Sequence, residues 1–221
     1  MNITKTPVFK NHHHELSTEI NPILSLEFSN IEKPIINVID GTNESSIIRE
    51  KINDNKIPIA ELVDYIIEVH HKYAKEFCPV ISSHIRTMTS KYGENHSNLI
   101  HVEVLFNEIL KRIDEHLLIK EIVLFPRIKL IEEVYSGLKE NKGISHVKSI
   151  IKVMMTDHKG ITKLMNEIRD LTDNFAVPDD SSSYYRLAFI ELQQLEKNFN
   201  QAANLEHSTI YPKALEMLNK L

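Results

Sequence analysis

Apolar residues recur at spacings of three and four along four long segments of this 221-residue chain. The segments cover residues 59–90, 97–139, 144–173 and 183–219. This spacing places apolar side chains on one face of an α-helix. Short links between four long helices favour antiparallel neighbours. The sequence therefore predicts an all-α fold, an up-down-up-down four-helix bundle.

Turn-forming residues mark the ends of these segments. A break is predicted around Gly93, and Gly143 is expected to end the second helix. Pro178 lies in the loop before the fourth helix, and the serines from Ser181 are suited to cap that helix. Pro126 falls inside the second segment, where it predicts a kink.

The chain divides into an N-terminal arm or small degenerate subdomain, residues 1–58, and a bundle, residues 59–221. The first part is weakly patterned and includes three consecutive histidines, His12, His13 and His14. Three adjacent residues cannot share one helix face. We therefore interpret residues 1–58 as a solvated polar arm rather than a metal site.

Composition excludes several classes of function. The net charge is -5 with no basic stripe, which argues against nucleic-acid binding. No apolar run approaches the roughly 20 residues that span a bilayer, and no secretory signal is present, so we expect a cytoplasmic protein. Cys78 is the only cysteine, which excludes an intrachain disulfide and an iron–sulfur cluster held by this chain alone.

Ionisable side chains interrupt the apolar stripes at one level of the predicted bundle. They are His71, His116, Lys120, His158 and Glu206. Burying an unpaired polar group costs roughly 2–7 kcal/mol, so these groups must satisfy one another or something bound between them. Imidazoles and carboxylates suit iron, zinc and manganese, and bundle cores hold such sites. The pattern predicts a metal site, with a hydrogen-bonded structural layer as the alternative.

The apolar stripe of the second segment carries His116 and Lys120 and is predicted to be regular, as is that of the first segment. In the second segment it runs through His116, Lys120 and Val123 without a slip in register. In the first segment it runs through Ile67 and His71. Unbroken α-helical periodicity is therefore expected through the polar layer.

Five short motifs give the chain a family resemblance. They are ELVDYIIEVHHKY at 61–73, NHSNL at 95–99, HLLIKEIVLFP at 116–126, DH at 157–158 and LEHSTIYP at 205–212. Together, over about residues 57–215, they resemble the iron–sulfur cluster repair di-iron proteins, also called Repair of Iron Centres. That resemblance implies a hemerythrin-like fold and a non-haem di-iron site.

The resemblance implies specific ligands. His71, His116 and His158 match iron-binding histidines of that family, and Glu206 matches a bridging carboxylate. His96 matches a further histidine near the site.

Two ligand positions depart from the family pattern. Lys120 stands where the resemblance implies a glutamate, and Ala202 stands where it implies a histidine. A protonated amine cannot coordinate a metal. Glu121 is adjacent to Lys120 but points about 100° further round an α-helix, so it replaces the lost carboxylate only if the helix bulges locally. Asp157 is a further candidate ligand, and we interpret it as a rim residue.

Three outcomes follow for the site. The chain binds two irons with solvent, Glu121 or Asp157 filling vacancies, or it binds one metal through His71, His116 and Glu206. In the third outcome Lys120 pairs with Glu206 and no metal is held, unless the long lysine stem extends to solvent.

The resemblance also implies a role, which we expect to be non-catalytic. The chain would hold iron and help restore iron–sulfur proteins damaged by nitric oxide or peroxide, and its open positions would admit nitric oxide or oxygen. Residues 1–58 lack the Cys-Cys pair that many family members carry there, so a dithiol function is not expected. A metal-free or one-metal bundle with a regulatory or interaction role is the alternative, as is an oxygen or nitric oxide sensor. Oligomeric state is not readable from the sequence.

Overall fold

A computed structural model describes residues 57–140, 142–178 and 181–221. All of them lie within one compact unit, residues 48–221. The predicted N-terminal arm lies outside the described residues except for its last two positions. The division into an arm and a bundle therefore stays a prediction.

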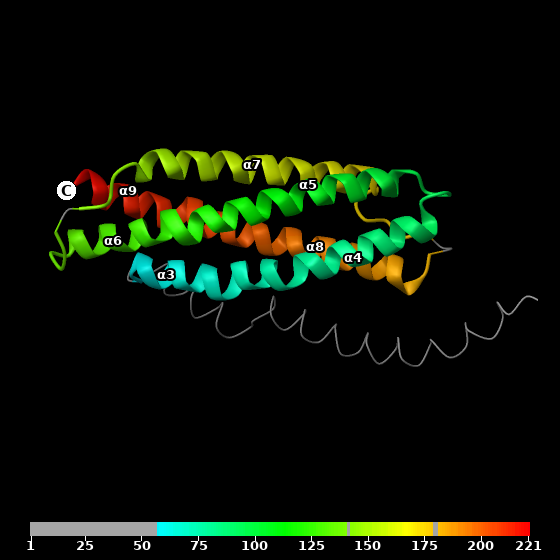
Figure 1. Cartoon of the computed structure of the whole chain (residues 1–221), viewed down its shortest axis with the longest axis horizontal. Helices are drawn as coiled ribbons and strands as arrows, with labels where there is room; N and C mark the ends of the chain where they lie inside the picture. The colour runs from blue at the N-terminus through cyan, green and yellow to red at the C-terminus, as the bar shows by residue number, and fades with distance from the viewer. Residues whose placement is uncertain (1–56, 141, 179–180) are drawn as a thin grey trace, which may run out of the picture. The chain divides into compact units, whose positions relative to one another are not determined.

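The described residues form four long helical rods and no strand (Figure 1). The first rod is α3 (Ile59–Tyr65), η1 (Ile66–His71) and α4 (Lys72–Tyr92); the second is α5 (Asn98–Ile119), η2 (Lys120–Leu124) and α6 (Phe125–Tyr135). The third is α7 (Val147–Leu171), and the fourth is α8 (Ser183–Leu205), η3 (Glu206–Ile210) and α9 (Tyr211–Asn219). The segments named η are single π-helical turns that continue the α-helices on either side.

The rods pack around one core with the neighbours expected of an up-down-up-down bundle. Helix α5 packs against α4 and α7, and α4 packs against α8. At the other end of the bundle α6 packs against α3 and α9. Figure 1 shows the four rods running nearly parallel to one long axis. The predicted all-α bundle is confirmed.

The second rod ends four residues earlier than predicted, at Tyr135 rather than 139. Gly137 adopts a left-handed backbone with φ 74°, which a residue with a side chain rarely adopts. Its N–H donates to Val134 O at 3.0 Å, and the N–H of Leu138 donates to Glu133 O at 2.9 Å. These two bonds are a Schellman motif, so Gly137 rather than Gly143 ends the helix.

The third rod is shorter than predicted at both ends. It begins at Val147 because His146, with φ 65°, is in the left-handed region and outside the helix. It ends at Leu171, and three consecutive residues from Asp173 to Phe175 have positive φ. The fourth rod has the predicted bounds, Ser183–Asn219.

Apolar layers lie on both sides of the polar level. On the side of α3, α6 and α9, side chains from all four rods form one buried cluster that includes Ile66, Phe125 and Met154. On the side of the α4–α5 turn, buried residues include Ile85 and Phe106. Within the described residues, no helix is both long and apolar enough to cross a bilayer.

Candidate metal centre

A π-helical turn stands at the polar level in three of the four rods. The turns are η1, which ends at His71, η2, which begins at Lys120, and η3, which begins at Glu206. A π turn carries an extra residue within an α-helix and occurs often at functional sites. The extra residue in each turn shifts which side chains of the adjoining helix face the core.

The predicted regular stripe is therefore wrong at this level. After Lys120 the next buried position is Leu124, not Val123, because η2 shifts the register by one residue. In the first rod, Ile66 is buried while Ile67 is only partly buried. The three-and-four spacing of an α-helix carries no sign of a π turn. The sequence pattern therefore predicted the position of the site along the bundle but not which residues face inward there.

Lys120 and Glu206 form a buried ion pair at the centre. The exposed fraction of the side chain is 2% for Lys120 and 0% for Glu206, and Lys120 Nζ lies 2.5 Å from Glu206 Oε1. The Tyr211 hydroxyl donates a hydrogen bond to Glu206 Oε2. The lysine stem does not extend to solvent. The Lys120–Glu206 contact named in the third outcome is present in this structure, and the metal content of the site stays a prediction.

His158 contacts the same ammonium, and His116 contacts His158. Lys120 Nζ donates to His158 Nε2 at 3.1 Å, and His158 Nε2 lies 2.8 Å from His116 Nε2. His158 Nε2 is also 3.7 Å from Glu206 Oε2. The Nε2 atoms of both rings and the Glu206 carboxylate thus converge on the position of one cation.

The opposite ring nitrogens face partners at the periphery. His158 Nδ1 lies 2.8 Å from His207 Nε2, and His116 Nδ1 lies 3.8 Å from Asp157 Oδ2. His71 Nδ1 lies 2.8 Å from Glu121 Oε1. Metal-binding histidines commonly donate their second ring N–H to an outer carboxylate, carbonyl or similar acceptor, which fixes the ring.

Glu121 reaches His71 because η2 bulges the helix at this point. Its second carboxylate oxygen accepts a hydrogen bond from Lys75 Nζ at 2.6 Å. The side chain is 24% exposed, so it lies at the rim rather than at the centre. Glu121 therefore contacts a candidate ligand, His71, from the rim of the site.

Burial keeps the histidines of this layer neutral. Burial, together with the charge of Lys120, lowers the pKa of His71 to about 3. The same two causes lower the pKa of His158 and of His116. Burial also lowers the pKa of Lys120, and the Glu206 carboxylate opposes that shift. Neutral imidazole is the form that binds metals.

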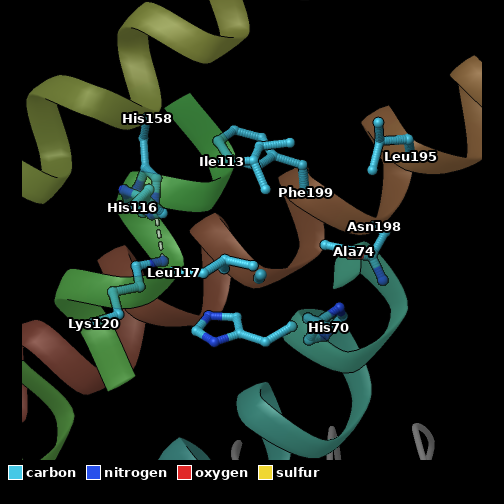
Figure 2. Close-up of a pocket in the computed structure, with 12 residues that line it drawn as sticks. His70, Ala74, Ile113, His116, Leu117, Lys120, His158, Leu195, Asn198 and Phe199 are labelled. Carbon is cyan, nitrogen blue, oxygen red and sulfur yellow. Dashed lines mark hydrogen bonds between the residues drawn. The ribbon is translucent and has the colours of Figure 1, made fainter. Parts of the chain in front are cut away.

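A small cavity lies beside this cluster. The volume open to the centre of a water molecule is about 20 Å³. That is room for one water molecule or a bare ion. Its lining includes His70, Ala74 and Lys120, which Figure 2 labels. His71 and Ala202 also line it. The gap at Ala202, where the resemblance implies an imidazole, is thus part of a real cavity.

Buried ring nitrogens without a hydrogen-bond partner occur at three histidines of the described chain. They are His70 Nδ1, His71 Nε2 and His116 Nδ1. An unpaired buried polar atom costs about 1–3 kcal/mol. His116 Nδ1 faces the Asp157 carboxylate 3.8 Å away, whereas His71 Nε2 has no hydrogen-bond partner among the described residues. His71 Nε2 has the orientation of a ligand atom, because Glu121 holds the other side of the ring.

The structure brings most of the predicted site residues together. His71, His116, His158 and Glu206, with Lys120 and Ala202, lie around the centre, and Asp157 and Glu121 lie at its rim. His96 is not part of the cluster; it lies at the turn before α5, with its ring centroid 6.0 Å from that of Tyr185.

Sequence reasoning missed several buried residues, among them His70 and Tyr211 at the centre. His70 lines the cavity beside His71 because η1 turns two consecutive residues inward, which an α-helix does not do. Tyr211 follows Glu206 by five residues, the hydrogen-bond interval of a π-helix. The His70-His71 doublet was the available signal for the first, and the five-residue interval had meaning only once η3 was known.

A family model for the hemerythrin HHE cation binding domain matches residues 62–214. The chain belongs to the hemerythrin family. Iron-sulfur cluster repair protein ScdA of Staphylococcus epidermidis is similar, with 23% identity over 91% of this chain and 81% of the relative. The protein of the same name from Staphylococcus haemolyticus is 24% identical over 80% of this chain and 77% of its own length.

A more distant relative is iron-sulfur cluster repair protein YtfE of Yersinia pestis. It is 21% identical over 72% of this chain and 66% of its own length. The predicted resemblance to cluster repair proteins is therefore confirmed, and iron binding is supported at the level of the family.

The donors of this hemerythrin domain fit a transition metal ion in their chemistry. Neutral imidazoles with peripheral Nδ1 partners and a buried carboxylate suit such a metal. Two metals would need further donors where Lys120 and Ala202 stand, and the Lys120 ammonium bonds Glu206 directly. Among the described residues, no three His, Cys, Asp or Glu side chains are arranged to hold a metal in this structure.

Proposed function

We propose that this hemerythrin-family protein holds a single non-haem iron reversibly and supplies it to iron–sulfur proteins whose clusters have been damaged. The observation that carries the proposal is the orientation of three neutral histidines. Their Nδ1 atoms face Glu121, Asp157 or His207, which leaves Nε2 toward the centre. The names of the similar proteins, iron-sulfur cluster repair proteins, support this role.

His71, His116, His158 and Glu206 would hold the iron. The bound iron would supply the missing metal of a damaged cluster, as cargo rather than as a catalyst. The protein's own contribution is to keep the imidazoles neutral by burial and to fix the His71 ring through Glu121. Damage by nitric oxide or peroxide is the stress that this role would answer.

The first test is metal analysis of the full chain purified from iron-replete cells, followed by anaerobic Fe(II) addition. We expect up to one iron per chain. The iron-loaded protein should restore activity to a dehydratase whose [4Fe–4S] cluster has lost iron, and the apoprotein should not. A protein that carries no iron and gains none contradicts the proposal.

A matched pair of variants separates the centre from adventitious histidine binding. His116→Gln removes a buried donor, whereas His101→Gln removes an exposed histidine of the same helix. Iron stoichiometry and cluster restoration should fall for His116→Gln and stay at the wild-type level for His101→Gln. Equal iron in the two variants would place the binding site elsewhere.

A metal-free role in regulation or protein interaction is the second candidate. The Lys120–Glu206 pair supports it, because an ammonium already neutralises the buried carboxylate. The absence of any iron-dependent change in the metal analysis above would select this alternative.

A further inference from the structure

The Lys120 ammonium has the surroundings of a bound metal ion. Its Nζ contacts a carboxylate oxygen of Glu206 at 2.5 Å and a ring nitrogen of His158 at 3.1 Å. These two acceptors come from the third and fourth rods, and His116 Nε2 lies 2.8 Å from the same His158 atom. The side chain is almost completely enclosed, with 2% of it exposed.

Metal and ammonium require the same electron pairs. Glu206 Oε1 and His158 Nε2 each use a lone pair to accept from Lys120. A metal ion that binds His158 Nε2 needs the single lone pair of that atom for itself, and at Glu206 Oε1 it would lie beside the ammonium. Two cations about 3 Å apart in a buried site would also repel each other strongly. The ammonium and a metal therefore exclude one another at this centre.

An unpaired nitrogen of His71 indicates that the centre can hold a second occupant. His71 Nε2 is buried without a hydrogen-bond partner, and it lines the same cavity as Lys120. The ammonium satisfies Glu206 and His158 but leaves His71 unsatisfied. A structural ion pair alone does not explain why this third imidazole is held in place by Glu121.

We infer that Lys120 is a tethered cation that occupies the metal centre of this protein and competes with metal for Glu206 and His158. The inference deepens the proposed function and rests on it for the claim that the centre accepts iron. Metal enters only when Lys120 leaves, so binding is weak and release is easy. Those are the properties of a centre that gives up its metal.

The structure also offers the displaced ammonium a destination. Asp157 lies at the rim with 37% of its side chain exposed, and its negative charge already acts on Lys120. The Phe125 ring centroid lies 5.9 Å from Lys120 Nζ. Lys120 stands in η2, a π turn whose backbone departs from the regular helix. A rotation of the side chain toward Asp157 would free Glu206 and His158 together.

The test compares metal affinity in the full chain with and without the ammonium. The probe is Co(II), measured by its visible spectrum and by competition with a chelator. Lys120→Gln removes the charge but keeps an amide that can donate to Glu206. We expect it to bind Co(II) at least 10-fold more tightly than wild type. Lys129→Gln, which removes a surface lysine paired with Asp64, is the matched control and should match wild type.

A double variant tests the same idea by restoring donors. Lys120→Glu with Ala202→His adds a carboxylate and an imidazole that line the cavity. We expect tighter binding than in Lys120→Gln and a rise toward two Co(II) ions per chain. It also keeps the test decisive if Lys120→Gln fails to fold. A folded double variant that binds Co(II) no better than wild type overturns the inference.

The outcomes separate this inference from the proposed function. If wild type holds no metal and Lys120→Gln does, the competition is supported and iron handling by the natural protein fails. Equal affinity in wild type and Lys120→Gln overturns the competition while the proposed function stands. If neither binds Co(II) or Fe(II), both are overturned.

Discussion

Glu206 is the residue on which the polar layer depends. Its carboxylate is completely buried and accepts from the Lys120 ammonium on one oxygen and from the Tyr211 hydroxyl on the other. Removal of one partner of a buried charge is costly because the remaining charge is left unsatisfied. Burial raises the pKa of Tyr211, so its hydroxyl remains protonated and can donate.

Tyr211→Phe tests the second of these bonds. It removes only the hydroxyl, so Glu206 Oε2 loses its donor while the ring packing is kept. We expect the free energy of unfolding to fall by about 1–3 kcal/mol, measured by urea denaturation. Tyr135→Phe, on a ring that is 44% exposed, is the control and should change stability by less than about 0.5 kcal/mol. Equal effects would mean that the Tyr211 hydroxyl contributes nothing specific.

A second buried carboxylate pairs with a histidine outside the candidate centre. His84 Nδ1 lies 2.7 Å from Glu191 Oε2, and the side chains are 19% and 2% exposed. This hydrogen bond raises the pKa of His84 above 6.5, with burial acting in the opposite direction. A raised folded-state pKa stabilises the fold while the imidazole is charged. The contribution is complete below the unfolded pKa of about 6.5 and is lost as pH rises through the folded pKa.

The pH dependence of stability follows from this pair. The difference in unfolding free energy between wild type and His84→Gln should be largest near pH 5.5 and shrink toward pH 9, measured by urea denaturation at each pH. NMR titration of the His84 ring should give a pKa above 6.5. A difference that does not vary with pH would show that the charged imidazole is not the source of the stabilisation.

At the scale of elements, the start of the first rod depends on a residue of another rod. Pro58 precedes α3, and no side chain of α3 caps its own N-terminus. Instead, the Glu132 carboxylate of α6 accepts from Ile59 N at 2.8 Å and from Ala60 N at 2.9 Å. Both donors belong to the first turn, where backbone N–H groups lack partners within the helix.

Glu132→Ala should therefore loosen α3. We expect a loss of about 0.5–2 kcal/mol in unfolding free energy, as for other helix caps, and faster amide hydrogen exchange at Ile59 and Ala60. Glu133→Ala is the neighbouring control, because Glu133 is 40% exposed and pairs with the exposed Lys139. If exchange at α3 is the same in both variants, the cap has no energetic role.

At the scale of the whole molecule, apolar packing on both sides of the polar layer holds the rods together. Met154 of α7 has no exposed surface, and the cluster it belongs to includes residues of all four rods. The adjacent Val153 is 52% exposed. Substitutions at these two adjacent positions can therefore separate the contribution of core packing to stability from that of the helix itself.

Met154→Ala should lower the free energy of unfolding by about 2–5 kcal/mol, because it removes buried contacts and leaves a cavity. Val153→Ala should change it by less than about 0.5 kcal/mol. Urea denaturation followed by circular dichroism measures both. Comparable losses would indicate that α7 contributes through its helical propensity and not through its buried face.

The sequence by itself determined the bundle and the level of its polar layer. Apolar spacing is a local property, and each stripe can be read without knowledge of the other helices. His71, His116, Lys120, His158 and Glu206 are all buried, as predicted from their positions on those stripes.

Only the tertiary structure decided the register of the layer and the partners within it. The π turns at η1, η2 and η3 change which residues face inward, and they moved the buried position from Val123 to Leu124. The spacing of apolar residues cannot predict the extra residue of a π turn, because contacts with the other rods offset the energetic cost of that turn. Lys120 is the clearest case, because its stem can reach either solvent or the core. A carboxylate 86 residues away, Glu206, holds its ammonium inside, and that contact exists only once the rods have packed.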